Sequence, residues 1–210
     1  MNKKILLILI LVITLIDLRG IHSTVYYYDE DFQINTFYST HDQNQDGIDD
    51  QSEILYYAKE YVSKKPKYKS KYYATGYPDD DYGVCTDVIG YALLHTGYDL
   101  KTLVHEDILE NRDDYDIETV DENIDFRRVK NLKVYFDHHF LSLSLDVNDI
   151  STWQGGDIVV FKNHIGIISD KRNENGIPYV IHHSRVFQFN YEEDILENRN
   201  DIAGHYRVSI

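Results

Sequence analysis

The sequence has 210 residues, which is long enough for one domain with a sizeable hydrophobic core. Its formal net charge of −15 at pH 7 gives a surface that repels phosphate backbones, so we expect no nucleic acid among its partners. Nineteen tyrosines against three prolines favour half-buried strands and grooves over a disordered chain.

The first 23 residues have the pattern of an export signal. Lys3 and Lys4 precede an apolar run from Ile5 to Ile16 that only Thr14 interrupts. A helical run of this length spans about 18 Å, short of the roughly 30 Å core of a bilayer, so a signal peptide fits better than a spanning helix. Because no small-x-small cleavage triplet stands out, an uncleaved membrane anchor is the alternative. Both interpretations place the protein outside the cell or in the cell envelope, with membrane contact only through this segment.

Residues 24–66 are predicted to form an N-terminal extension. Its first part, 25–38, is rich in tyrosine and alternates loosely, as an early strand or an extended arm would. An acidic loop follows, and then a helix with apolar residues at helical spacing from Ile54 to Val62, which ends before Pro66.

The acidic loop at 42–53 has the spacing of a calcium-binding loop. Ca²⁺ prefers six to eight oxygen ligands, and this twelve-residue pattern wraps side chains and one carbonyl around a single ion. The predicted ligands are Asp42, Asn44, Asp46, the carbonyl of Ile48, Asp50 and Glu53. Gly47 occupies the sharp turn, whereas Asp49 replaces the apolar residue that pairs two such loops, so we expect a solitary structural calcium site. The alternative is a solvated acidic turn.

Cys85 is the only cysteine of the chain, and it follows a loop at 66–82 and opens an apolar-periodic helix that stops at Gly97. Unpaired backbone N–H groups at a helix N-terminus favour the thiolate and lower the pKa of a thiol. Exported proteins tend to pair their cysteines, so an unpaired one suggests a reactive thiol or an intermolecular bond. The plain alternative is a buried, inert cysteine.

The rest of the chain changes from helical to strand periodicity. Residues 98–123 are polar and acidic and are expected to be irregular with one helical turn, whereas 131–140 is predicted to be a short helix. After residue 150 the apolar period becomes two, which predicts strands at 157–161, 164–168, 179–182 and 204–208. Helices followed by an antiparallel sheet indicate the α+β class, with the helices packed on the sheet.

A thiol nucleophile needs a base, a group that orients the base, and an oxyanion donor. His164 begins a predicted strand and is the candidate base, and His182 on the next strand is placed to bond its far nitrogen. His183 would point to the opposite face of a regular strand, so only one of the pair can serve. The backbone N–H of Cys85 and the hydroxyl of Tyr73 are candidate oxyanion donors, although Tyr73 can equally be one more tyrosine of its loop.

Arg127 and Arg128 are candidates for binding a substrate carboxylate. Residues of this kind more often form structural ion pairs with neighbours such as Asp125.

Six motifs together resemble the bacterial domain-of-unknown-function family 1287, over roughly residues 40–210. They are Gly76-Tyr77-Pro78, GVCTDV at 83–88, NIDFRRVKNL at 123–132, GGDIVVF at 155–161, HIGIISD at 164–170 and GHYR at 204–207. That family in turn resembles the NlpC-type, papain-like cell-wall hydrolases. The resemblance implies a papain-like fold with Cys85 as nucleophile, His164 as base, His182 as orienting residue and Tyr73 beside the oxyanion site. One departure is Asp87, which stands where those hydrolases have a glycine and disfavours a thiolate unless it faces away or pairs with an arginine.

The leading expectation is therefore a secreted or membrane-tethered hydrolase, with its catalytic domain at 67–210, that cleaves an amide bond. Peptidoglycan stem peptides are the most plausible substrate, and no organic cofactor is expected. A non-catalytic, calcium-stabilised binding module of the cell surface is the first alternative. An acyltransferase or transglutaminase-like enzyme using the same cysteine and histidine is the second.

Overall fold

The computed structural model describes residues 25–208. The predicted signal peptide or anchor at 1–23 therefore lies outside the described residues. No helix between residues 25 and 208 is both long and apolar enough to cross a bilayer.

The chain combines α-helices with an antiparallel sheet, as the α+β prediction requires. The α-helices within residues 25–208 are α2 (Asp50–Ser63), α3 (Cys85–His95), α4 (Leu100–Glu110), α5 (Glu122–Asp125) and α6 (Val129–His139). Short 3-10 helices are η1 (Asp29–Phe32), η2 (Arg112–Asp114) and η3 (Leu196–Asn198). The strands are β1 (Lys67–Tyr68), β2 (Tyr82–Gly83), β3 (Leu141–Ser142), β4 (Ile158–Phe161), β5 (His164–Arg172), β6 (Pro178–Ile181), β7 (Glu192–Glu193) and β8 (Ile202–Arg207).

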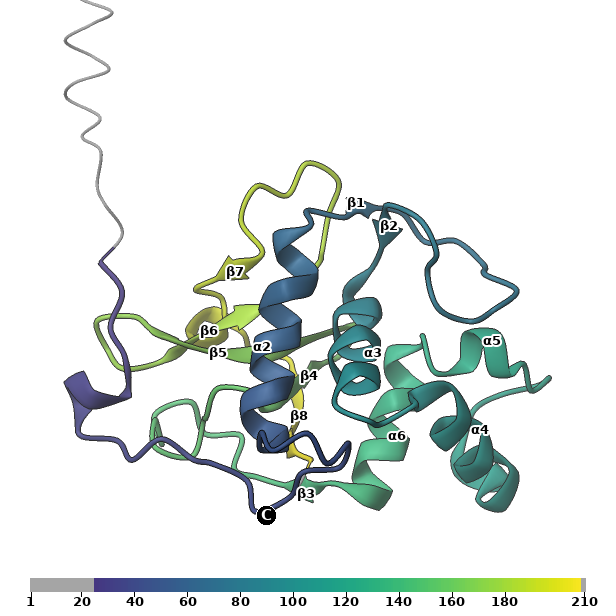
Figure 1. The fold of residues 1–210 in the computed structure, drawn as a ribbon, viewed down its shortest axis with the longest axis horizontal. Coiled ribbons are helices and arrows are strands. Elements are labelled where there is room, and N and C mark those ends of the chain that lie inside the picture. Colours follow the sequence, from purple (N-terminus) through teal and green to yellow (C-terminus); the bar gives the residue numbers. More distant parts are fainter. Residues whose placement is uncertain (1–24, 209–210) are drawn as a thin grey trace, which may run out of the picture.

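The main sheet has the strand order β3-β8-β4-β5-β6-β7, and its neighbouring strands all run antiparallel. A separate two-stranded parallel pair, β1 and β2, precedes α3. The helices α2 and α3 lie side by side across the sheet at β5, and α4, α5 and α6 form a second helical group beside them (Figure 1). The strands predicted after residue 150 and the helix predicted at 131–140 are confirmed. Their ends are shifted by at most two residues, except that β5 continues four residues beyond the predicted end, to Arg172.

The central strands are buried on both faces, which explains their continuous apolar sequences. In β4, Ile158 and Val160 pack toward α2 and α3, whereas Val159 and Phe161 join a second cluster around Trp153 on the other face. This alternation follows from the period of two along a strand. The face of the sheet that carries Ile158 and Val160 packs against α3. This packing holds the start of α3, and therefore Cys85, against β5.

The helix α2 belongs to the same core as α3. Its Ile54, Ala58 and Tyr61 are buried in the cluster that also contains the apolar face of α3. The expected early strand or arm at 25–38 is an arm that makes an isolated bridge at Tyr27 and contains η1. It is held by a buried ion pair between Asp29 and Arg172, with Nε and Oδ1 2.7 Å apart.

The helix α4 corrects the expectation of an irregular segment at 98–123. Leu100, Val104 and Ile108 are fully buried at a spacing of four residues, and Asp99 caps the helix by accepting the backbone N–H of Lys101. Glu106 and Asp107 stand between these positions and give the segment its acidic composition, which hid the narrow apolar stripe in the sequence.

A buried carboxylate ties the sheet together and explains two of the sequence motifs. Asp157, from GGDIVVF, is fully buried and receives two hydrogen bonds of 2.8 Å from the guanidinium of Arg207. It also bonds His205 at 3.0 Å and Gln51 of α2 at 3.0 Å. The GHYR motif at the C-terminal end therefore has a structural role, because it neutralises Asp157.

Candidate functional site

Cys85 begins α3, as the sequence predicts, and its side chain is partly buried against the start of β5. Burial raises the pKa of the thiol to about 11, although the backbone N–H groups of Ile165, Thr86 and Cys85 itself act in the opposite direction. The helix N-terminus thus acts as expected, but desolvation is the larger effect. The resting thiol is therefore neutral at physiological pH.

The structure brings His164 and His182 together. Their Nε2 and Nδ1 atoms lie 2.8 Å apart, and the thiol of Cys85 receives the backbone N–H of Ile165, the residue next to His164. Gly166 makes this approach feasible, because a Cβ there would lie 3.3 Å from the Cβ of His182 and 2.5 Å from Val180. A larger residue at position 166 would clash with Val180 and the carbonyl of Ile181, the two residues of β6 that precede His182.

The far side of His182 meets a carboxylate that the sequence analysis missed. Its Nε2 lies 3.2 Å from Oε2 of Glu193 on β7. Arg185 in turn binds both oxygens of Glu193, at 3.1 and 2.5 Å. The local signal for Glu193 was weak, since it stands in an acidic segment, 193–200, that closely repeats residues 106–113. Only the pairing of β6 with β7 brings it to the site.

Burial keeps both histidines neutral. It is the main cause that lowers the pKa of His164 to about 3, and the neighbouring His182 is the next cause. Burial also lowers the pKa of His182 to about 4, and there the next cause is the charge of Arg185. If each ring carries one proton and Glu193 is a carboxylate, the hydrogen-bond chain fixes the tautomers. His182 donates from Nε2 to Glu193, and His164 donates from Nε2 to His182. The Nδ1 of His164 is then left as a proton acceptor.

The sequence requires Asp87 either to face away from the thiol or to pair with an arginine. In the structure it pairs with an arginine. Arg127 binds it through two hydrogen bonds of 2.7 and 2.9 Å, and both side chains are only 2% exposed. A further bond joins Arg127 to the carbonyl of Lys71 at 2.7 Å. The structure therefore corrects the prediction of a substrate-binding Arg127, because its guanidinium is committed to Asp87. Arg128 is 52% exposed, 3.7 Å from Asp125, and stays a candidate.

Tyr73 is also engaged elsewhere. Its hydroxyl donates to Asp80 Oδ1 at 2.7 Å, and the guanidinium of Arg127 lies 4.9 Å from the centre of its ring. Because the single hydroxyl proton is used in this bond, Tyr73 does not supply the predicted oxyanion donor. Tyr68 on β1 is coupled to the cysteine instead: burial is the main cause that raises the pKa of its phenol, and the negative charge of a thiolate at Cys85 is the second.

His183 takes no part in the hydrogen bonds that link His164, His182 and Glu193, as the alternation of side chains along a strand predicts. Its ring lies 5.2 Å from those of Tyr68 and Tyr191, and neither of its nitrogens has a hydrogen-bond partner. Burial lowers its pKa to about 4. The adjacent histidines therefore occupy different environments, and only His182 belongs to the hydrogen-bonded chain.

The acidic loop gathers negative charge around Glu53. Burial first, and then the charges of Asp46, Asp50 and Asp42, raise the pKa of Glu53, which is 2% exposed. Gly47 has the positive φ of 96° that the sharp turn requires.

Hydrogen bonds within the loop already engage Asp42, Asn44, Asp46 and Glu53, and Asp50 is also engaged outside it. Asp50 accepts hydrogen bonds from the backbone of Gln43 at 2.8 Å and from the hydroxyl of Tyr98 at 2.5 Å. The donor set fits Ca²⁺ at Asp42, Asn44, Asp46, the Ile48 carbonyl and Glu53. Position 9, occupied by Asp50, often acts through a water molecule in such loops.

A cavity of about 540 Å³ lies against α2 and α3. Tyr61 and Lys64 of α2, Asp87 and Tyr91 of α3, and Tyr82 contribute to its lining. Cys85, His164 and His182 do not line it. The cavity is therefore separate from the cysteine and its histidines.

Comparisons with known proteins match most of the chain. The family model described as "Domain of unknown function (DUF1287)" matches residues 55–208, a range that includes Cys85, His164 and His182 but not the acidic loop. A relative from Escherichia coli (strain K12), described as "Uncharacterized protein YijF", is 37% identical over 154 residues, which cover 69% of this chain and 73% of the relative. No solved structure matches the chain.

Proposed function

The chain belongs to the DUF1287 family, and from this premise and its site geometry we propose that it is a cysteine hydrolase with a papain-like arrangement of NlpC type. The observation that carries the proposal is the 2.8 Å bond between His164 and His182 beside the thiol of Cys85. A cysteine at a helix start, a histidine at a strand start and a polar orienting group on the next strand form the required sequence of groups.

The reaction proceeds from a neutral thiol and a neutral imidazole. His164 takes the thiol proton at Nδ1 as the sulfur attacks the amide carbonyl, because burial disfavours a charged pair at rest. The C–N bond breaks when His164 returns this proton to the leaving amine. Water then attacks the thioester, which releases the carboxylic acid and restores the thiol.

Glu193 and His182 are positioning residues in this mechanism. His182 passes the orientation set by Glu193 to His164 through bonds of 3.2 and 2.8 Å. The positive charge that develops on His164 during the reaction is stabilised by Glu193, which is itself held by Arg185. The backbone N–H groups of Ile165, Thr86 and Cys85 that approach the sulfur are the candidate oxyanion donors.

The substrate that we propose is an amide bond in peptidoglycan stem peptides. The apolar run at 5–16 supports export to the compartment where that polymer lies. Arg128 is 52% exposed and pairs with Asp125 at 3.7 Å, so a free carboxylate of the peptide could bind its guanidinium in competition with this ion pair. The calcium site that we propose at Asp42, Asn44, Asp46, Ile48 and Glu53 stabilises the start of α2 and takes no part in the chemistry.

The test uses peptidoglycan fragments that carry stem peptides, and mass spectrometry to detect paired new amines and carboxylates. We expect the full chain to release such products and the Cys85→Ala variant to release none. The adjacent histidines provide a matched pair: His182→Phe is expected to lose activity and His183→Phe to retain it. Equal product release by Cys85→Ala and the unmodified chain would exclude this mechanism.

A second candidate function is a calcium-stabilised binding module of the cell surface. The observation that favours it is the raised pKa of Cys85, about 11, which gives a thiol of low resting reactivity. In this case the unmodified chain would bind the fragments without cleaving them. The Cys85→Ala variant would then bind them with the same affinity.

A further inference from the structure

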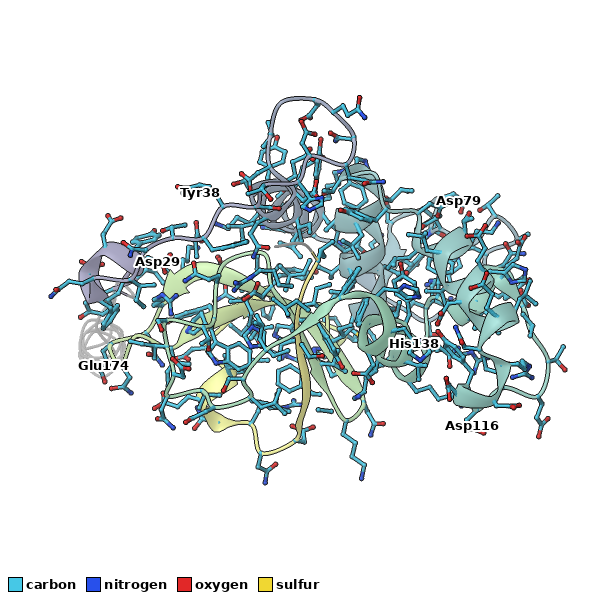
Figure 2. All side chains as sticks on the ribbon, turned by 90° about the horizontal axis from the view of Figure 1, so that it is seen from below. Asp29, Tyr38, Asp79, Asp116, His138 and Glu174 are labelled. Carbon is cyan, nitrogen blue, oxygen red and sulfur yellow. The ribbon has the colours of Figure 1, made fainter. Side chains whose placement is uncertain are left out.

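Two histidines and a buried carboxylate converge at the junction of α4 and α6, away from the thiol site. His138, labelled in Figure 2, and His139 end α6, and Asp107 lies in the last turns of α4. Asp107 Oδ2 lies 2.8 Å from His138 Nδ1, and Asp107 Oδ1 lies 2.8 Å from His139 Nε2. The three ligand atoms all lie within 4.8 Å of one another. From this convergence we propose that Asp107, His138 and His139 bind a divalent transition-metal ion such as Zn²⁺.

The chemistry of the donors favours this class of metal. Imidazole nitrogen and carboxylate oxygen are standard zinc ligands, whereas Ca²⁺ and Mg²⁺ prefer sites made of oxygen alone. Adjacent ligands of a tetrahedral zinc ion with bonds of about 2.0–2.1 Å lie about 3.3 Å apart. The two separations between Asp107 and the histidines, 2.8 Å each, differ from this value by about 0.5 Å. The His139 side chain is 45% exposed, so a water molecule can reach the cluster as a fourth ligand.

An independent observation is the second layer of polar and charged side chains around the ligands. Metal-binding histidines generally donate from their outer nitrogen to a carboxylate or a carbonyl. His138 has a carboxylate on this side, since its Nε2 lies at an ion-pair distance of 3.4 Å from Asp114 Oδ2. Asp107 is oriented in turn by the hydroxyl of Tyr115 and by Asn111, whose Nδ2 donates at 2.8 Å.

The ring nitrogens of His138 and His139 can exist in the protonation state that metal binding requires. In the metal-free protein the ring nitrogens that face Asp107 can donate to it, and they must lose these protons to bind a metal. For His138 the remaining proton then resides on Nε2, which faces Asp114. The bound ion would link α4 to α6 without contact to the thiol site.

The experiment measures Zn²⁺ binding to the full chain by isothermal titration calorimetry, with Ca²⁺ present in excess to occupy the acidic loop. We expect one Zn²⁺ per chain, and binding lost in His139→Gln. A visible absorption spectrum of bound Co²⁺ with tetrahedral character would identify the coordination independently. Circular dichroism checks that each variant is folded.

The sharpest comparison is between two neighbouring exposed aspartates. Asp114→Asn removes the second-layer carboxylate and leaves all three ligands in place, so we expect Zn²⁺ affinity to fall by about 10- to 100-fold. Asp113→Asn, one residue earlier on the same turn, is expected to leave the affinity unchanged. Absence of Zn²⁺ binding, or equal affinity in folded His139→Gln, would show that the cluster is only a hydrogen-bonded link between two helices.

Discussion

Asp87 shows how one buried side chain controls its surroundings. A carboxylate two residues from a nucleophilic cysteine opposes formation of the thiolate, and its charge does raise the pKa of Cys85. The bidentate contact with Arg127 compensates this buried charge and removes Arg127 from the set of substrate ligands. This one ion pair explains how the motif tolerates Asp87 beside the cysteine, and why Arg127 is not free to bind a substrate carboxylate.

This ion pair can be tested by its effect on stability. Asp87→Asn leaves the charge of Arg127 buried and unpaired, so we expect the free energy of unfolding to fall by about 3–5 kcal/mol. The double variant Asp87→Leu with Arg127→Met replaces the pair by apolar groups and is expected to recover most of that loss. Urea denaturation measures both. An unchanged stability in Asp87→Asn would mean that Arg127 is not held by this pair.

At the scale of elements, the acidic loop and α2 form one unit. Asp49 caps α2 by accepting the backbone N–H of Ser52, and Glu53 lies in its first turn among the charges of the loop. Negative residues near a helix N-terminus are favourable, but their mutual repulsion opposes this arrangement unless a cation is bound. Calcium binding would therefore stabilise the helix that packs beside α3.

The calcium prediction belongs to this element. Addition of Ca²⁺ is expected to raise the melting temperature of the full chain, because an ion that binds only the folded state stabilises it by about 2.7 kcal/mol at 100 times its dissociation constant. Asp46→Ala is expected to abolish the rise, whereas Asp79→Ala, an exposed aspartate outside the loop, should preserve it. A melt of the unmodified chain that EGTA leaves unchanged would exclude the site.

At the scale of the whole molecule, a sheet covered on both faces buries several histidines. Desolvation lowers the pKa of His182 and of His183 to about 4, from the ordinary value of 6.5. Below about pH 6.5 the unfolded chain takes up protons that the folded chain does not, so stability decreases as the pH falls toward 4. Above about pH 6.5 both states are neutral at these positions, and the full stability is retained.

His183 allows this pH dependence to be measured without disturbing the hydrogen bond between His164 and His182. Each buried neutral histidine contributes up to about 1.4 kcal/mol per pH unit within the window. His183→Phe is therefore expected to flatten the dependence of unfolding free energy on pH between 6.5 and 4. His95→Phe, at an exposed position, should leave the slope as it is. Identical slopes for His183→Phe and the unmodified chain would contradict the assignment.

The sequence by itself determined the features that depend on local pattern. The helical spacing of apolar residues predicted α2, α3 and α6, and with α3 the position of Cys85 at a helix start. The period of two predicted the strands β4, β5, β6 and β8. Strand order in the sequence also suggested that His164 and His182 would be neighbours, because consecutive antiparallel strands usually pair.

Tertiary structure alone decided the contacts between distant segments and the balance of desolvation against hydrogen bonding. Glu193 reaches His182 because β7 pairs with β6, and Asp107 meets His138 because α4 packs on α6, and neither contact has a local signature. The pKa of Cys85 is raised because burial outweighs the N–H groups of the helix start, and only the packing of α3 on β5 determines that burial. Period and spacing are properties of neighbouring residues, whereas solvent exclusion is a property of the assembled core.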